Sequence, residues 1–299
     1  MDLIYRYDPY QPLTLSAPSN AEAALDILRK GNERFVEIVA RMHRATMGEA
    51  VESPMVIPVN PLALGLPLWP AASMDQAPFG LVIGCSDARA PVEQVFDQAF
   101  NSLFVVRIAG NVLGTECLGS VDYAVRTMAE SVKFVLVLGH SGCGAVTAAV
   151  DAYLNPSDFS DIASTHALRS LINRVMIAVR GAAKGLQLVA GPAVVNHPGY
   201  RKALIELAVY VNAAVTAFDL RRELAHLQLP EMRVVYGVYD LESLRVHAEP
   251  DNCEYGAAHC TQTFGDAPRE AEQFNDLARH LAERVIALQL SGRTDPSNF

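Results

Sequence analysis

The clearest feature of the hydrophobic pattern is a pair of unbroken apolar runs. They cover residues 79–83 and residues 134–138, and each has the length of a β-strand. Runs without polar interruption are typical of strands that are buried on both faces of a parallel sheet. Two further runs of strand length occur at residues 103–109 and 233–239. The pattern therefore predicts an α/β fold with a mostly parallel central sheet of about four core strands.

Segments with helical periodicity separate these runs and should flank the sheet. Ser19 and Glu22 have the spacing of a capping box, which predicts that the first helix begins there, and its apolar stripe ends near Val39. Residues 240–247 predict a hairpin that adds an antiparallel edge to the sheet. Apolar residues at helical spacing predict helices at residues 19–39, 91–100, 117–128, 145–153, 168–188, 200–227 and 268–290.

Three segments lie outside this alternation of strands and helices. Residues 1–18 are rich in proline and tyrosine and predict an extended N-terminal arm, either placed on a neighbouring subunit or loosely ordered. Residues 45–75 are rich in proline and predict a long irregular connection. Residues 250–299 form a C-terminal extension, in which a turn-rich loop precedes the last helix. We expect the whole chain, residues 1–299, to form a single domain.

Composition excludes several classes of function. Hydrophobic residues make up 51% of the chain, which supplies a large core, and the net charge is −9 at neutral pH. Nucleic-acid binding needs a basic surface, so it is not expected. Five cysteines are too few for a disulfide scaffold, and the N-terminus lacks the basic head and apolar core of a signal peptide. No apolar run predicts a membrane span. We therefore expect a cytoplasmic protein.

Candidate metal ligands follow the apolar runs at residues 79–83 and 134–138. Cys85 stands just after residues 79–83, and His140 and Cys143 follow residues 134–138. In parallel sheets, ligands bind beyond the carboxyl ends of the strands, so neighbouring strands would bring these three side chains to one point. Two thiolates and an imidazole are typical of a catalytic zinc site with a fourth position left for water. The sequence therefore predicts a zinc centre.

The motifs Cys85-x-Asp87-x-Arg89 and His140-x-x-Cys143 together resemble the β-class carbonic anhydrases, in particular their plant-like branch. The resemblance implies that the two cysteines and the histidine bind Zn²⁺. It also implies that Asp87 and Arg89 form a dyad beside the metal-bound water. The implied reaction is the reversible hydration of carbon dioxide to bicarbonate and a proton. In another state of the family the aspartate binds the metal, so Asp87 is either a gate or a fourth ligand.

The resemblance extends to residues 20–36 and 76–247. Gly31-Asn32-Glu33-Arg34-Phe35 matches a pattern at the end of the family's first helix. Two positions depart from family patterns, because Ile108 replaces an asparagine and Leu244 replaces a glycine in the hairpin.

The same resemblance implies a pocket for carbon dioxide lined by Gln76, Phe104, Tyr123 and Gly142. Each of these residues also has a structural explanation: Phe104 and Tyr123 as core residues, Gln76 as a loop residue and Gly142 as a turn. In the family such pockets form between two subunits. The resemblance therefore implies a homodimer or a dimer of dimers.

Several alternatives remain open from the sequence. The same scaffold and ligands would serve an enzyme that hydrolyses carbonyl sulfide or carbon disulfide. The chain could also be a non-catalytic homologue that acts as a binding or shell component, although such a protein should have lost a ligand or the dyad. The three ligands alone would also fit a structural zinc or buried thiols. A second metal site at Cys253, His259 and Cys260 has only weak support.

Overall fold

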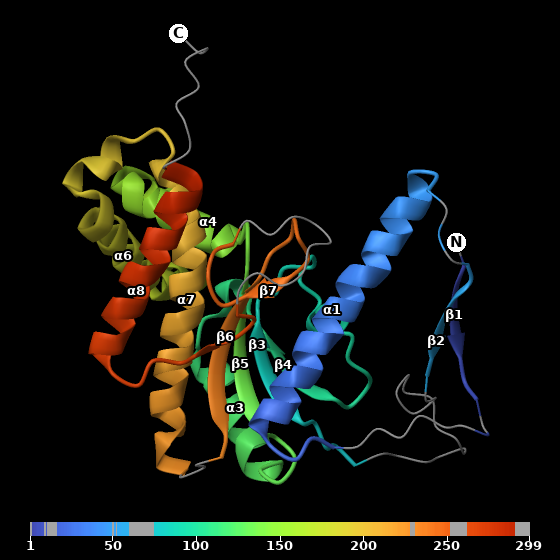
Figure 1. Ribbon diagram of the computed structural model, residues 1–299. Helices are drawn as coiled ribbons and strands as arrows, with labels where there is room; N and C mark the ends of the chain where they lie inside the picture. Colours follow the sequence, from blue (N-terminus) through green and yellow to red (C-terminus); the bar gives the residue numbers. More distant parts are fainter. Residues whose placement is uncertain are drawn as a thin grey trace.

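A mixed β-sheet forms the centre of the structure (Figure 1). The computed structural model describes residues 2–8, 10, 17–49, 51, 53–59, 75–227, 231–251 and 262–290. The sheet has the order β4-β3-β5-β6-β7, and β8 also pairs with β6. Strands β3 to β6 are parallel and β7 and β8 are antiparallel to β6, which confirms the predicted fold class. The strands are β3 (Gly80–Gly84), β4 (Leu103–Arg107), β5 (Phe134–His140), β6 (Arg233–Tyr239), β7 (Val246–His247) and β8 (Gly265–Asp266).

Two apolar clusters cover the two faces of this sheet. All residues of β3 and β5 are buried. Leu81 and Ile83 face the larger cluster, whereas Val82 between them faces the smaller one. The helices on the larger side are α3 (Thr115–Thr127), α4 (Gly144–Leu154), α6 (His166–Ala190), α7 (Tyr200–Leu224) and α8 (Ala271–Val285). The smaller side is covered by α1 (Ala21–Thr46) and α2 (Val92–Val95), and Figure 1 shows α1 and α7 on opposite sides of the sheet.

The bounds of α1 differ from the sequence prediction at both ends. Its N-cap is Asn20 rather than Ser19, because the Asn20 side chain accepts a hydrogen bond of 2.9 Å from the backbone N–H of Ala23. The helix also continues beyond Val39 to Thr46. Its last turns are mostly exposed, so no apolar stripe marks them in the sequence. An ion pair of 2.8 Å between Glu37 and Arg41, one turn apart, supports this exposed part.

The helix predicted at residues 91–100 is much shorter than expected. Only α2, Val92–Val95, is helical, and Asp97 already has a φ of +47°. A left-handed residue cannot continue a right-handed helix, which explains the early end. Two short elements lie between α4 and α6: a 3₁₀ turn at Pro156–Asp158 and α5 (Phe159–Ile162). After α8, Ile286–Leu290 form a π-helical turn.

The Gly31-Asn32 motif joins α1 to the hairpin region. A side chain at position 31 would lie 1.8 Å from the carbonyl oxygen of Phe96, so only glycine allows this close approach. The buried Asn32 amide donates to the carbonyls of Val95 and Leu244 at 3.0 and 2.9 Å. Its oxygen accepts from Val246 N–H at 3.1 Å. The motif therefore satisfies three buried backbone groups at once.

Leu244, which departs from a family glycine, has a φ of +62°. The turn thus keeps the left-handed conformation that glycine adopts most readily. Leu244 packs against the smaller apolar cluster, which offsets part of the backbone strain.

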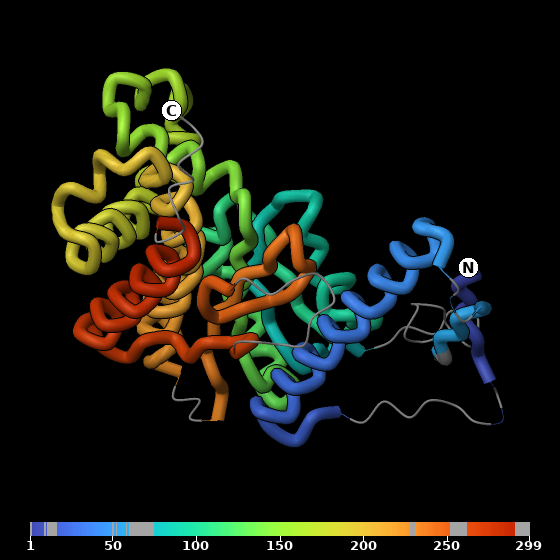
Figure 2. Tube along the Cα trace, turned by 45° about the horizontal axis from the view of Figure 1, so that its top comes forward, coloured from blue at the N-terminus to red at the C-terminus, as the bar shows by residue number. Residues whose placement is uncertain are grey.

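The N-terminal arm and the proline-rich connection form a separate two-stranded sheet. Strand β1 (Leu3–Arg6) pairs in parallel with β2 (Met55–Pro58). Figures 1 and 2 show this pair beside the distal end of α1, away from the central sheet. The prediction that residues 45–75 are irregular is therefore wrong for β2. The run Met55-Val56-Ile57 has strand composition, but its partner lies 52 positions away in register, where no local pattern points to it.

The segment Tyr200–Leu227 is long and apolar enough to cross a membrane by length and composition alone, but 72% of its most apolar stretch is buried within the structure. Its helix α7 contacts β5, β6, α6 and α8. The apolar composition of α7 therefore reflects its position as the central helix of the larger cluster.

Candidate metal centre

The three predicted ligands converge at the carboxyl edge of the sheet. Cys85 follows β3, His140 ends β5, and Cys143 is the N-cap of α4. Because β3 and β5 are neighbours in register, the ligand atoms of these residues lie within 4.8 Å of one another. The two sulfur atoms are 4.0 Å apart. The side chains are buried, with exposed fractions of 5%, 0% and 1%, so the predicted convergence is confirmed.

The hydrogen bonds of His140 prepare the ring for a metal ion. Its Nδ1 lies 2.9 Å from the backbone oxygen of Ser141, and because a carbonyl only accepts, Nδ1 carries the proton. In the neutral ring Nε2 is then the unprotonated nitrogen, and it is buried with no hydrogen-bond partner within the described part of the chain. A buried polar atom left unpaired is costly. A soft cation between Nε2 and the two sulfurs would satisfy it, and this donor set suits Zn²⁺.

The two thiols share their protons unequally. A hydrogen bond from Cys143 lowers the pKa of the Cys85 thiol well below its ordinary value, and the backbone N–H of Gly110, 3.3 Å from Cys85 Sγ, adds to this effect. The same thiol–thiol contact, together with burial, raises the pKa of Cys143. The pair thus favours one thiolate, and binding of a divalent cation would displace the remaining proton.

Asp87 and Arg89 form a two-pronged ion pair next to the ligands. Arg89 Nε donates to Asp87 Oδ1 at 3.0 Å, and Nη2 donates to Oδ2 at 2.7 Å. This contact holds the pKa of Asp87 well below its usual range. Asp87 Oδ2 lies 3.8 Å from Nε2 of His140. The structure therefore has an ionised carboxylate beside the position where a metal would lie, held by its arginine.

A hydrogen-bonded clasp, formed by Ser141, Asp240 and Ser243, joins the ends of β5 and β6. Ser141 Oγ donates to Asp240 Oδ1 at 2.9 Å and accepts from the backbone N–H of Leu241 at 2.8 Å. Asp240 Oδ2 accepts from the backbone N–H and hydroxyl of Ser243 at 2.8 and 2.7 Å. Burial alone would raise the pKa of Asp240, but these hydrogen bonds outweigh it and lower the pKa. The clasp fixes the peptide whose oxygen orients His140.

Arg107 and Asn212 hold the loop around Cys85, and the sequence reasoning did not assign them this role. Arg107 donates to the backbone oxygens of Cys85 and Asp87 at 2.9 and 2.5 Å. Asn212 of α7 donates to the carbonyl of Gly110 at 2.8 Å, the same residue whose N–H contacts the Cys85 sulfur. Polar residues at the end of a strand (Arg107) and within an otherwise apolar helix (Asn212) are the signals that could have identified them.

The four predicted substrate-pocket residues lie in different settings. Gln76 is exposed in the segment before β3, and Phe104 is partly buried against the larger cluster. Tyr123 on α3 is 55% exposed. Gly142 has a φ of +64°, and its carbonyl accepts from Arg89 at 3.3 Å. A shared role of these residues in binding carbon dioxide stays a prediction. The second candidate metal site, Cys253 with His259 and Cys260, lies outside the described residues.

Comparison with known proteins points to one family. The family model described as Carbonic anhydrase matches residues 80–243, more than half of the chain. "Carbonic anhydrase 2" of Mycobacterium tuberculosis is 35% identical over 142 residues, covering 45% of this chain and 55% of that protein. "Carbonic anhydrase" of Mycolicibacterium smegmatis is 37% identical over 134 residues, with the same coverages of 45% and 55%. The chain thus spans about half the length of the curated relatives that it matches.

Two solved structures are similar to this chain at lower identity. A β-carbonic anhydrase of Coccomyxa in complex with acetazolamide has a TM-score of 0.44 and 24% identity, covering 57% of this chain and 72% of that one. The β-carbonic anhydrase CafA of Aspergillus fumigatus has a TM-score of 0.47 and 20% identity, with coverages of 68% and 82%. The sequence match over residues 80–243 contains all three ligands and the Asp87–Arg89 pair, and it makes this chain a member of the β-class carbonic anhydrase family.

Proposed function

We propose that the chain catalyses the reversible hydration of carbon dioxide to bicarbonate and a proton, with one Zn²⁺ held by Cys85, His140 and Cys143. The observation that carries this proposal is the buried set of three ligands with an ionised Asp87 beside it. When bound, Zn²⁺ would supply a Lewis acid that lowers the pKa of a water molecule toward neutrality.

The residues around the metal position would have distinct roles in this reaction. Asp87 is ionised and can only accept hydrogen bonds, so its Oδ2 would accept one from the attacking water and orient that water toward carbon dioxide. Arg89 keeps the carboxylate ionised and aimed by contacting both of its oxygens. Arg107 fixes the backbone on both sides of this carboxylate. The protein therefore positions the nucleophile before the substrate arrives.

Stopped-flow measurement of carbon dioxide hydration, with the metal content assayed in the same sample, tests this function. We expect rapid turnover with about one zinc per chain, loss of turnover after removal of the metal by a chelator, and recovery on addition of Zn²⁺. Zinc-loaded protein that is inactive at neutral and at mildly alkaline pH would contradict the proposal. Assays with carbonyl sulfide and carbon disulfide would then distinguish another hydrolase from a binding protein.

We also propose that the chain assembles at least as a dimer through the β1–β2 sheet. Leu3 and Tyr5 lie on one face of β1 and are 38% and 58% exposed, and Ile4 lies on the other face and is 43% exposed. A lone two-stranded sheet is only marginally stable in water, and apolar side chains exposed on both of its faces favour burial against another chain. Light scattering coupled to size exclusion should give a dimer or a multiple of it. Ile4→Asp should shift the protein toward monomer, whereas Leu188→Asp on α6 should not. A wild-type monomer at micromolar concentration would refute this assembly.

A further inference from the structure

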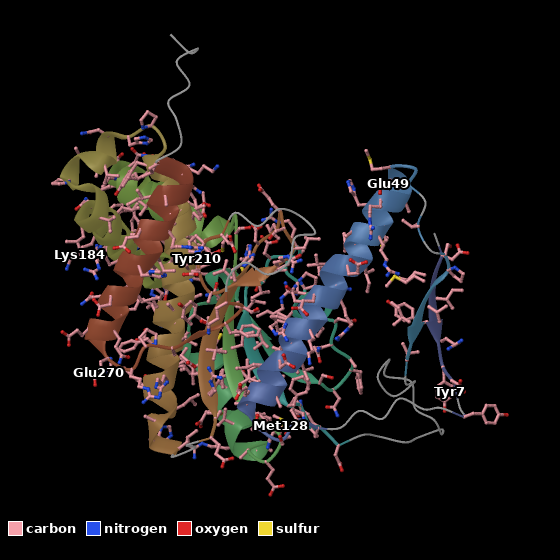
Figure 3. All side chains as sticks on the ribbon, viewed as in Figure 1. Tyr7, Glu49, Met128, Lys184, Tyr210 and Glu270 are labelled. Atoms are coloured by element: carbon pink, nitrogen blue, oxygen red, sulfur yellow. The ribbon has the colours of Figure 1, made fainter. Side chains whose placement is uncertain are left out.

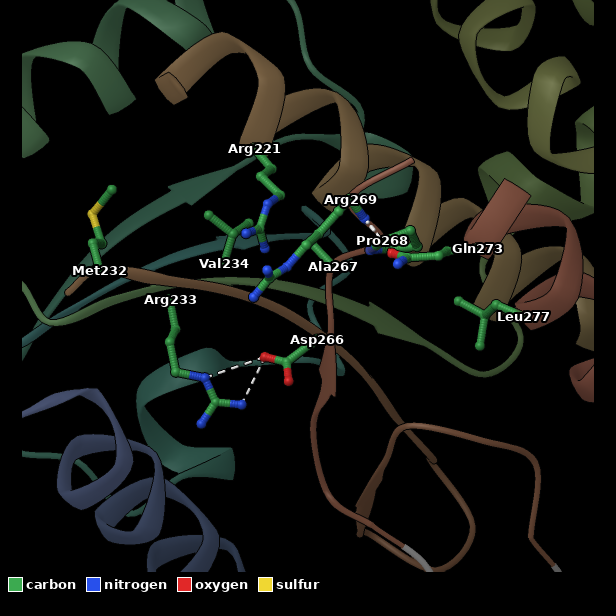
Figure 4. Close-up of a pocket in the computed structure, with 10 residues that line it drawn as sticks. All are labelled: Arg221, Met232, Arg233, Val234, Asp266, Ala267, Pro268, Arg269, Gln273 and Leu277. Atoms are coloured by element: carbon green, nitrogen blue, oxygen red, sulfur yellow. Dashed lines mark hydrogen bonds and ion pairs between the residues drawn. The ribbon is translucent and has the colours of Figure 1, made fainter. Parts of the chain in front are cut away.

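A polar cavity lies at the amino-terminal end of β6, whereas the metal centre lies at the carboxyl ends of the strands; Figure 4 shows the residues that line this cavity. Its volume is about 420 Å³, and its walls come from α7, β6, β8, α8 and the segment between β8 and α8. Arg233, the first residue of β6, lines this cavity, whereas Tyr239, the last, pairs with His140. The length of β6, about 3.3 Å per residue, therefore separates the cavity from the metal site.

Three arginines and one aspartate set the charge of the cavity. Arg233 and Asp266 form an ion pair of 2.7 Å and neutralise each other. Arg221 of α7 and Arg269 extend into the same space in Figure 4. Neither forms an ion pair with another residue in the part of the chain that the structure describes. The cavity thus keeps two positive charges in a chain whose net charge is −9. Two guanidinium groups that share a cavity repel each other unless an anion lies between them.

The remaining wall of the cavity is mostly apolar, with the amide of Gln273 as its polar member. Met232, Val234 and Leu277 line it, and Val234 is buried. The volume of 420 Å³ falls within the range of small-molecule pockets, about 300–1,000 Å³, and exceeds what a single inorganic ion needs. The cavity therefore offers both a cationic end and a surface for an organic group.

We propose that this arginine cavity, defined by Arg221, Arg233 and Arg269, binds a small organic monophosphate. The phosphate group carries about two negative charges near neutral pH, which match the two uncompensated arginines, whereas a single carboxylate carries one. Its oxygens can accept forked hydrogen bonds from both guanidinium groups. The organic part of the ligand lies along Met232, Val234 and Leu277. This site is independent of the proposed hydration reaction.

Isothermal titration calorimetry on the full-length, zinc-loaded protein tests the proposal, with phenyl phosphate, inorganic phosphate and benzoate as probes. Phenyl phosphate should bind most tightly, because it alone combines a dianion with an apolar group. Arg221→Gln and Arg269→Gln should each weaken its binding at least about ten-fold, and Arg221→Lys should weaken it less. Arg180→Gln, at an exposed position of α6, is the matched control and should leave the affinity unchanged.

Each other outcome overturns the proposal. Absence of phenyl phosphate binding, or binding that is equally tight in the Arg221→Gln and Arg269→Gln variants, would show that the cavity is not a phosphate site. The second result would place the probe elsewhere, for example at the metal. If inorganic phosphate bound as tightly as phenyl phosphate, the apolar wall would have no role in binding. Equal affinity for benzoate would exclude selection of a dianion.

Discussion

At the scale of single residues, each atom around the metal position has a specific environment. In the neutral imidazole of His140, Nε2 is the nitrogen with a free lone pair, because the carbonyl of Ser141 holds the proton at Nδ1. The Cys85 sulfur accepts a hydrogen bond from the backbone N–H of Gly110, and the Asp87 carboxylate forms an ion pair with Arg89. These contacts favour a thiolate at Cys85 and a carboxylate at Asp87 before any metal binds, and they leave one proton on the thiol pair for a metal to displace.

Loss of one thiolate should remove the metal. Cys143→Ala is expected to reduce the zinc content from about one per chain to nearly none, because a soft ligand is lost from a site with only three protein ligands. Elemental analysis after gel filtration measures this. Cys117→Ala, at another buried cysteine on α3, is the control and should keep the zinc. Equal zinc content in the two variants would exclude Cys143 as a ligand.

Loss of the Asp87 charge should separate metal binding from catalysis. Asp87→Asn should keep the zinc and lower kcat for carbon dioxide hydration by a factor on the order of 10² or more, because the amide presents donors where the carboxylate accepts. Asp97→Asn is the matched control, since Asp97 forms an exposed ion pair with Arg34 away from the metal centre. Unchanged turnover in Asp87→Asn would refute the positioning role.

At the scale of elements, the metal centre depends on how strand ends are tied to one another. The clasp of Ser141, Asp240 and Ser243 links β5 to β6, and Asn212 links α7 to the loop after β4. Neither link touches the metal position directly. Both hold backbone groups that orient a ligand.

Removal of the clasp should weaken metal affinity. Ser141→Ala leaves the Asp240 carboxylate and the Leu241 N–H without their shared partner, and we expect the affinity for zinc to fall about 10-fold to 100-fold. Competition with a chromophoric chelator measures this. Ser120→Ala on α3, where the hydroxyl only contacts its own helix, should leave the affinity unchanged. A similar loss in both variants would mean that the effect is not specific to the clasp.

Two glycine-to-alanine changes should have opposite effects on stability. Gly110 has a φ of +69°, and an added Cβ would lie 3.1 Å from that of Ala145, so Gly110→Ala should lower the free energy of unfolding by about 1–3 kcal/mol. Gly119 lies inside α3 with open space around it, so Gly119→Ala should raise the free energy of unfolding by about 1 kcal/mol. Denaturant unfolding of both variants checks the signs.

At the scale of the whole molecule, the central sheet and the three ligands could be predicted from the sequence. Buried parallel strands appear as apolar runs, and the carboxyl ends of neighbouring strands meet. What the sequence did not show depends on contacts between distant segments. The pairing of β1 with β2, the role of Asn212 and the clasp at Asp240 all join residues that are far apart in the chain. The helix ends at Thr46 and Val95 depend on exposed or left-handed residues that carry no apolar pattern.

Because the β1–β2 sheet is separate from the central sheet, it should unfold locally while the central sheet stays folded. Leu3 pairs with Met55, and the chain between them includes all of α1. Pairing of β1 with β2 therefore closes a long loop and gains only four paired residues on each strand. The entropy of closing this loop opposes pairing, and little core burial compensates for it. In an isolated subunit, backbone amides of β1 and β2 should therefore exchange with solvent deuterium through local opening, far sooner than those of β3 and β5.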